Sequence, residues 1–273
     1  MLYARSQELL RWMLPGKAFR LIYNIALFAH NTRVKAFDYL YYAVTILYCK
    51  IRWRTNGVNK IKTILKIRSY TMVGREGLIK TYDIASKIET ENIKGSFVEC
   101  GVARGGCSAL MALTARNNRH IWLFDSFEGM GEPSSEDEHT DPMRYIPSNR
   151  ASDIVLSGYC LGTFNEVREL LFNKLELNPA NIRMVKGWFE DTLPEYKLVV
   201  GPISLLRIDC DWYEPTKCCL DNLYDNVEPG GFIIIDDYRS YPGSKKATDE
   251  YFENRNIAVD MSFDNRGGCY ITK

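Results

Sequence analysis

The chain has 273 residues, of which 46% are hydrophobic and 25% charged. This composition is typical of soluble globular proteins and excludes disordered and collagen-like chains. The length fits one α/β domain with an appendage. Eight scattered cysteines without a C-x-x-C pair argue against a disulfide-stapled protein and against a structural zinc site, so we expect reduced thiols. The first residues lack the pattern of a secretory signal, which predicts a cytoplasmic protein.

The net charge of +1 hides two oppositely charged parts. Residues 1–68 carry 13 Lys and Arg against two acids, a net charge of +11, and residues 69–273 carry 22 basic and 32 acidic residues, a net charge of −10. We therefore expect a basic, aromatic-rich helical extension (1–68) and a main domain (69–273). No nucleic-acid partner is expected.

Two interpretations of the extension stay open. Its longest charge-free stretches, 21–32 and 39–49, are shorter than the roughly 18 residues of a membrane span. Its helices could act as a lid or as the contact of a homo-oligomer, packing on an acidic body. Tyr and Trp flanked by Lys and Arg could instead lie on an anionic membrane, at its inner face.

Along the chain, the hydrophobic pattern predicts first helices and then alternating strands and helices. Helices are expected over 21–29, 36–49, 57–69, 75–88, 105–117, 164–174 and 215–226. Strands are expected over 96–100, 121–124, 182–185, 203–208 and 232–235. Apolar strands alternating with helices predict an α/β, Rossmann-like domain with a mostly parallel sheet covered on both faces. Residues 258–263 and 269–272 predict an antiparallel hairpin at its C-terminal edge.

A glycine-rich turn joins the first strand to its helix, in the stretch 97–106 (FVECGVARGG). Such a turn is a candidate nucleotide site. Ala103 stands where a dinucleotide fingerprint needs glycine, so the turn suits a ligand without phosphates, such as S-adenosylmethionine. Glu99 can pair with its ammonium group, Gly101 lets the backbone approach it, and Arg104 lies within the turn.

Later strand ends supply further candidate contacts to the cofactor. Asp125 follows Gly105 by 20 residues, about the offset at which an acid accepts hydrogen bonds from ribose hydroxyls, and Ser126 continues that loop. Gly187 and Trp188 follow the strand over 182–185. The Trp188 ring either stacks on adenine or packs in the core.

Two neighbouring strands end in aspartates: Asp209 and Asp211 follow one, and Asp236 and Asp237 follow the next. Parallel strands joined by one crossover helix bring these ends to the same edge. Carboxylates so close repel unless a cation neutralises them, and all-oxygen ligands favour Mg²⁺, with Mn²⁺ or Ca²⁺ possible. The alternative is that Asp236 and Asp237 cap the next helix or loop.

Six motifs together resemble the macrocin O-methyltransferase (TylF-like) family. They are 70–72 (YTM), 97–106 (FVECGVARGG), 125–129 (DSFEG), 187–194 (GWFEDTLP), 206–214 (LRIDCDWYE) and 229–238 (PGGFIIIDDY). The family usually has Gly where Cys210 stands. The resemblance implies a class I S-adenosylmethionine-dependent fold and methylation of a hydroxyl on a sugar, a glycosylated metabolite or a glycan.

The resemblance also implies residue roles. Asp209, Asp236 and Asp237 would hold Mg²⁺, and Asp211 would be the general base. Asp125 would hold the ribose, Glu99 and Gly101 the methionine end, and Tyr70, Thr71 and Met72 would close over the cofactor.

The remaining candidate is His139, in a long polar loop over 129–149 that suggests a substrate lid. Three rival functions stay open. A catechol-type or other small-molecule O-methyltransferase would use the same sheet edge. An NAD-binding oxidoreductase shares the fold but gives no reason for the converging aspartates, and a non-catalytic Rossmann-like binding protein has no need of them.

Overall fold

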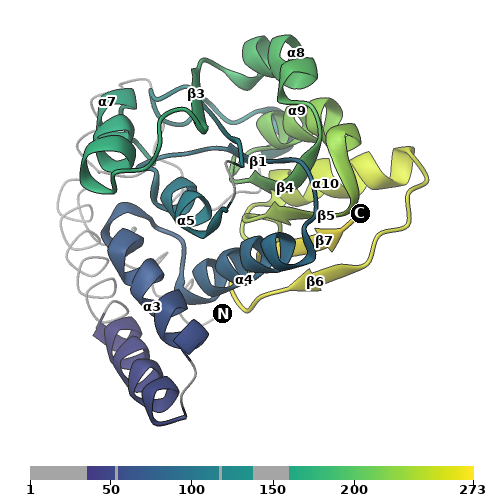
Figure 1. Cartoon of the computed structure of the whole chain (residues 1–273). Coiled ribbons are helices and arrows are strands. Elements are labelled where there is room, and N and C mark those ends of the chain that lie inside the picture. The colour runs from purple at the N-terminus through teal and green to yellow at the C-terminus, as the bar shows by residue number, and fades with distance from the viewer. Residues whose placement is uncertain (1–35, 53–54, 117–118, 138–159) are drawn as a thin grey trace, which may run out of the picture. The chain divides into compact units, whose positions relative to one another are not determined.

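A computed structural model describes residues 36–52, 55–116, 119–137 and 160–273 (Figure 1). Two compact units divide between Ile61 and Lys62, inside helix α3 (Thr55–Ile67). The expected helix over 21–29 and His139 lie outside the described residues. Residues 36–51 form one helix of the first unit, confirming the helix expected over 36–49. No helix in the described ranges is long and apolar enough to cross a membrane.

A seven-stranded sheet forms the centre of the second unit, in the order β3-β2-β1-β4-β5-β7-β6 (Figure 1). Strands β1 to β5 pair in parallel, β7 runs antiparallel to β5, and β6 runs antiparallel to β7. The strands are β1 (Ser96–Cys100), β2 (Ile121–Asp125), β3 (Ile182–Lys186), β4 (Ile203–Ile208), β5 (Val227–Ile235), β6 (Met261–Phe263) and β7 (Cys269–Thr272). The predicted parallel sheet with an antiparallel C-terminal hairpin is confirmed.

Helices cover both faces of this sheet. Helices α4 and α5 pack together on one face, and α8, α9 and α10 lie side by side on the other (Figure 1). The helices are η1 (Arg68–Tyr70), α4 (Arg75–Glu91), α5 (Gly106–Thr114), η2 (Ser135–Asp137), α7 (Phe164–Arg168), the π-helix η3 (Glu169–Lys174), α8 (Phe189–Val200), α9 (Tyr213–Leu223), η4 (Tyr224–Asn226) and α10 (Pro242–Asn254). Apolar strands buried on both faces explain why β1 and β4 have no exposed residue.

The sequence did not predict helices α8 and α10. Pro194 lies inside α8, and an interior proline normally signals the end of a helix. Helix α10 has Pro242 at its first position and a largely polar sequence, so its start signal is present but its apolar stripe is weak. The strand expected over 258–263 shortens to Met261–Phe263.

Candidate active site at the carboxyl edge of the sheet

The turn after β1 lies directly against the end of β4. Gly101 has φ +89°, and a Cβ on it would lie 1.9 Å from the carbonyl oxygen of Asp209. Only glycine fits both that conformation and that approach. Gly105, at φ +81°, is the N-cap residue of helix α5. The predicted cofactor turn and the first predicted metal ligand are therefore neighbours.

The segment Tyr70, Thr71 and Met72 lies over the start of α5. A Cβ on Gly106 would be 2.6 Å from both Cβ of Thr71 and the carbonyl oxygen of Tyr70. The Thr71 hydroxyl lies 3.7 Å from Sγ of Cys107, and the Met72 side chain is 50% exposed. The structure thus brings this segment to the glycine turn.

Asp125 ties the glycine turn to the end of β2. Its Oδ2 accepts hydrogen bonds from the amides of Val102 at 2.6 Å and Ala103 at 3.1 Å, and its Oδ1 accepts one from Phe127 at 2.6 Å. Burial raises the pKa of Asp125, and these backbone hydrogen bonds oppose the rise. A carboxylate has about four acceptor sites, so one stays available for a ligand hydroxyl.

The neighbouring loops contain the other predicted cofactor residues. The Ser126 hydroxyl donates to the carbonyl of Gly129 at 3.0 Å, which folds the loop after β2. The Gly187 amide donates to the carbonyl of Asp125 at 3.0 Å. Trp188 precedes α8 and is 40% exposed, so the alternative of a core tryptophan is wrong. Arg104 is exposed within the turn.

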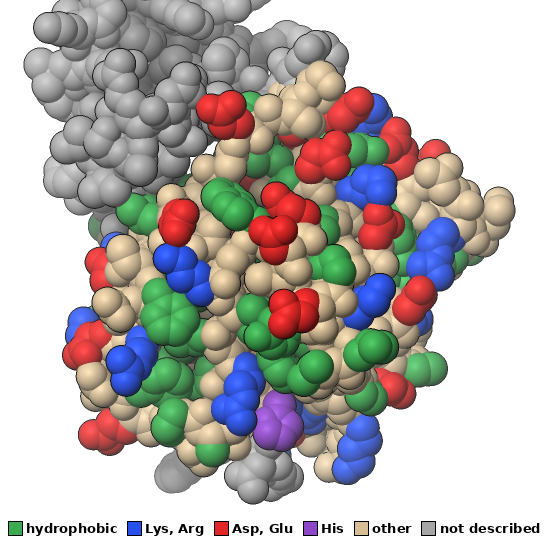
Figure 2. Space-filling view, turned by 90° about the horizontal axis from the view of Figure 1, so that it is seen from above, with side chains coloured by type: hydrophobic (Ala, Val, Ile, Leu, Met, Phe, Trp, Pro, Cys, Tyr) green, Lys and Arg blue, Asp and Glu red, His purple; other side chains and the backbone are tan. Residues whose placement is uncertain are grey.

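Three aspartates converge where β4 and β5 end. One carboxylate oxygen from each of Asp209, Asp236 and Asp237 lies within 4.8 Å of the others. The amide of Asp236 donates to the carbonyl of Ile208 at 3.0 Å, which holds the two strand ends together. Figure 2 shows a face of the molecule on which acidic side chains lie among hydrophobic ones.

Asp236 and Asp237 do not cap helix α10, whose N-cap residue is Tyr241 and which has no side-chain cap bond. Oδ2 of Asp237 is buried and has no hydrogen-bond partner among the described residues. A buried carboxylate oxygen without a donor, beside two more carboxylates, fits a divalent cation bound by oxygen ligands.

Asp211 lies beside this cluster in a left-handed backbone conformation, with φ +60°. Burial, followed by the charges of Asp209 and Asp236, raises its pKa to about 8, and hydrogen bonds with Asp237 and Tyr241 oppose the rise. Burial also raises the pKa of Asp236 to about 6. A carboxyl group that titrates near neutral pH is suited to accept a proton.

The sequence patterns did not point to Arg207, on β4. Its side chain is fully buried, and it donates to Oε1 of Glu99 at 3.0 Å, to Oδ2 of Asp209 at 2.7 Å and to Oδ1 of Asp236 at 2.8 Å. Glu99 also accepts a hydrogen bond from Ser108, and burial raises its pKa to about 7 against the opposing charge of Arg207. The signal in the sequence was a single arginine inside an otherwise apolar strand.

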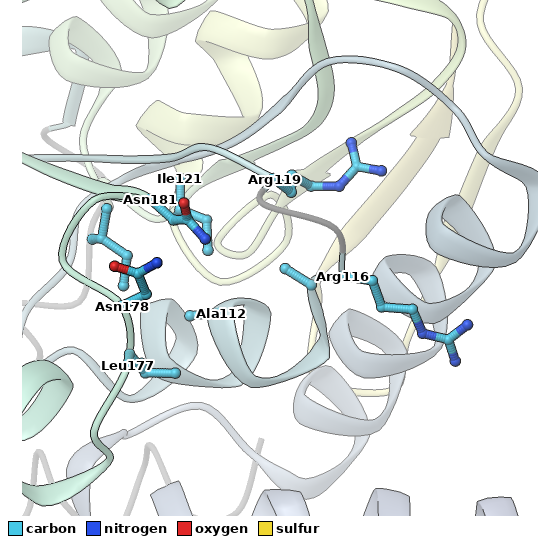
Figure 3. Close-up of a pocket in the computed structure, with 9 residues that line it drawn as sticks. Ala112, Arg116, Arg119, Ile121, Leu177, Asn178 and Asn181 are labelled. Carbon is cyan, nitrogen blue, oxygen red and sulfur yellow. The ribbon is translucent and has the colours of Figure 1, made fainter.

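A hollow of about 200 Å³ lies at the opposite edge of the sheet, where β2 and β3 begin and α5 ends (Figure 3). The Arg116 and Arg119 side chains point away from it (Figure 3). Arg119 instead binds Glu89 and the Ser204 hydroxyl. This hollow is separate from the carboxylate cluster.

Comparison with known proteins identifies the family. A family model described as macrocin O-methyltransferase (TylF) matches residues 49–273. The match therefore begins before residues 70–72, the first of the six motifs. The chain is 34% identical over 206 residues to demethyldecarbamoylnovobiocin O-methyltransferase of Streptomyces niveus, covering 74% of this chain and 75% of that protein. It is 35% identical over 175 residues to 8-demethyl-8-(2,3-dimethoxy-alpha-L-rhamnosyl)-tetracenomycin-C 4'-O-methyltransferase of Streptomyces olivaceus, covering 62% and 63% of the two chains.

A solved structure agrees with these matches. The O-methyltransferase NovP has a TM-score of 0.62 and 31% identity, covering 75% of this chain and 82% of that one. The fold is thus that of the class I S-adenosylmethionine-dependent methyltransferases. These matches do not support the two alternatives of an NAD-binding oxidoreductase and a non-catalytic Rossmann-like binding protein. The chain belongs to the macrocin O-methyltransferase (TylF) family and is an O-methyltransferase.

Proposed function

We propose that this enzyme transfers the methyl group of S-adenosylmethionine to a hydroxyl of a sugar, a glycosylated metabolite or a glycan, with the assistance of Mg²⁺. The observation that carries the proposal is the convergence of Asp209, Asp236 and Asp237 within 4.8 Å. Asp209 also touches the glycine turn through Gly101. A metal and a methyl donor held at these places would be neighbours.

The substrate class is proposed from the relatives. The name of the Streptomyces olivaceus relative includes a rhamnosyl group and places the methylation at a 4'-oxygen. A hydroxyl on a sugar ring has neighbouring hydroxyls, so two oxygens can approach the same cation. A catechol offers the same pair of oxygens on an aromatic ring, which makes it the alternative to test.

The proposed cofactor site uses the residues around the glycine turn. Asp125 would accept hydrogen bonds from the ribose, and the exposed Trp188 ring would stack on adenine. Gly101 and Arg104 would lie along the methionine part. Glu99 is buried, and its two oxygens accept from Arg207 and Ser108, so its charge would act on the ammonium group without a direct contact. Tyr70, Thr71 and Met72 would cover the cofactor, while Ser126 and Gly187 shape the loops around the ribose and adenine.

The proposed mechanism depends mainly on the alignment of the substrate hydroxyl with the methyl group of S-adenosylmethionine. Bound Mg²⁺ would supply Lewis acidity that lowers the pKa of a substrate hydroxyl. Asp211 would take the proton of that hydroxyl, because it lies beside the metal-ligand candidates and forms a hydrogen bond with Asp237. The glycine turn and the β4 end would hold the sulfonium methyl in line with the oxygen, which lowers the entropic part of the barrier.

The test compares the wild type with Asp236→Asn. Both proteins are titrated with S-adenosylmethionine by calorimetry and assayed with its trideuteromethyl form against nucleotide sugars, glycolipids, glycosylated metabolites and catechols. The variant should bind the cofactor nearly as well as the wild type but lose Mg²⁺-dependent transfer. Labelled catechol without labelled sugar would contradict the proposed substrate class.

We further propose that the N-terminal extension contacts an anionic membrane surface. In the helix over 36–51, Leu40, Val44, Leu47 and Ile51 recur at helical spacing, and each is 58–67% exposed. Residues 1–68 have a net charge of +11. That charge attracts anionic lipid and repels the same segment of a second copy, so it favours lipid over a homo-oligomer contact.

Flotation with vesicles tests this surface. The full chain should float with vesicles that contain phosphatidylglycerol and stay at the bottom with pure phosphatidylcholine. Leu47→Asp should lose flotation, whereas Leu198→Asp, at a position 86% exposed on α8, should keep it. A dimer that Leu47→Asp dissociates, without flotation of the wild type, would contradict the proposal and favour a second copy.

A further inference from the structure

Through its ion pairs, Arg207 joins β1, which leads into the glycine turn, to the ends of β4 and β5, where the metal-ligand candidates lie. It lies on β4, in register with Glu99 on β1. Its guanidinium is fully buried and pairs with Glu99, Asp209 and Asp236. A charge buried this deeply is stable only when it is paired and hydrogen-bonded.

The fork of the guanidinium contacts one oxygen of each metal-ligand candidate. Nη1 donates to Oδ2 of Asp209 at 2.7 Å, and Nη2 donates to Oδ1 of Asp236 at 2.8 Å. Each carboxylate then has its other oxygen left for a cation. When an arginine binds one oxygen of a carboxylate, the carboxylate is hindered from binding a metal ion with both oxygens. The metal ion and the guanidinium are both positively charged and repel each other.

We propose that Arg207 is a positioning residue that limits Asp209 and Asp236 to one metal-ligating oxygen each and makes the site select Mg²⁺ over Ca²⁺. Mg²⁺ demands near-octahedral geometry and usually keeps waters around one or two carboxylates, whereas Ca²⁺ takes six to eight oxygens and often binds carboxylates through both. The inference rests on the proposed metal site.

Glu99 anchors this arrangement from the opposite side. One of its oxygens accepts from Arg207 and the other from the Ser108 hydroxyl. The anchor fixes the guanidinium plane, and the plane in turn fixes the two aspartates. Loosening Glu99 should therefore change metal selectivity without any change in the ligands themselves.

The decisive variant is Arg207→Lys, which keeps the positive charge but loses the planar fork. Mg²⁺ and Ca²⁺ are titrated separately by calorimetry into the full chain in the presence of S-adenosylhomocysteine. Loss of an outer-shell partner costs about 10- to 100-fold in metal affinity, and we expect that loss for Mg²⁺ and a smaller one for Ca²⁺. The readout is the ratio of the two affinities, because a change in charge or overall stability affects both divalent ions alike.

Two further variants complete the test. Thr248→Ala removes a buried hydroxyl on α10 that donates to the Ser244 carbonyl, outside this network, and should keep the wild-type ratio of Mg²⁺ to Ca²⁺ affinity. Glu99→Gln should lower the ratio of Mg²⁺ to Ca²⁺ affinity, as Arg207→Lys should. If circular dichroism shows that the lysine variant does not fold, Glu99→Gln takes its place in the test. A folded Arg207→Lys variant with the wild-type ratio would overturn this inference while leaving the metal site standing. Absence of metal binding in the wild type would overturn both.

Discussion

A Cβ placed on Gly101 would lie 1.9 Å from the carbonyl oxygen of Asp209. The cofactor turn and the end of β4 are therefore in direct backbone contact, and neither can shift without the other. This contact explains how one sheet edge can hold a methyl donor and a carboxylate cluster at a fixed separation.

Gly101→Ala should destabilise the protein strongly. The substitution adds a Cβ where φ is +89° and where the backbone of Asp209 leaves no space. Gly230→Ala is the matched control, because Gly230 has φ +80° with nothing within 4 Å of the added Cβ. In the control, the free energy of unfolding should fall only by the cost of the strained backbone conformation, about 1–3 kcal/mol. Equal losses in urea unfolding would show that the Gly101 contact is not tight.

Asp211→Asn should lower kcat by about 10²- to 10⁴-fold, the usual contribution of a general base. The amide keeps the shape of the side chain but cannot take a proton, so cofactor affinity should stay near that of the wild type. Asp221→Asn, in an exposed pair with Lys217 on α9, controls for loss of a carboxylate as such. A wild-type kcat in Asp211→Asn would show that another group acts as the general base.

Trp188→Ala should weaken binding of S-adenosylhomocysteine. Base stacking on an aromatic side chain contributes about 1–3 kcal/mol, which corresponds to roughly 5- to 150-fold in Kd. Trp188→Phe, which keeps an aromatic face, should retain most of the affinity. If calorimetry gives the same Kd for the alanine variant and the wild type, the adenine lies elsewhere.

The stabilisation by Mg²⁺ should increase with pH. Burial raises the folded-state pKa of Asp236 to about 6 and that of Asp211 to about 8, above the ordinary value of 3.8. A raised carboxyl pKa favours the protonated folded state, so the metal-free protein loses stability as the pH rises from about 4 to about 8. Mg²⁺ held by the ionised carboxylates of Asp209, Asp236 and Asp237 neutralises their charge and offsets this loss.

Thermal unfolding with EDTA or with Mg²⁺ measures that effect. The difference in Tm between the two conditions should be small near about pH 5 and larger near about pH 8. The same comparison in Asp236→Asn should show little difference at either pH. A constant difference in Tm across the range would mean that Asp236 does not bind the ion.

The sequence predicted the sheet and the convergence of the aspartates, because apolar strands followed by acids are local signals. Asp209 and Asp236 lie together for the reason expected: β4 and β5 are parallel neighbours. The partner of Glu99 was not predictable, since Arg207 is distant in sequence and its orientation depends on three strands. Helix α8 was hidden by Pro194, although its start after Trp188 was within a recognised motif.

The most direct test is methyl transfer from trideuteromethyl S-adenosylmethionine to the glycosylated acceptors, with EDTA in one series and excess Mg²⁺ in the other. Mass spectrometry should find one trideuteromethyl group on a sugar oxygen with Mg²⁺ and none with EDTA. Equal labelling of the sugar in both series would contradict the claim that the aspartates act through a metal.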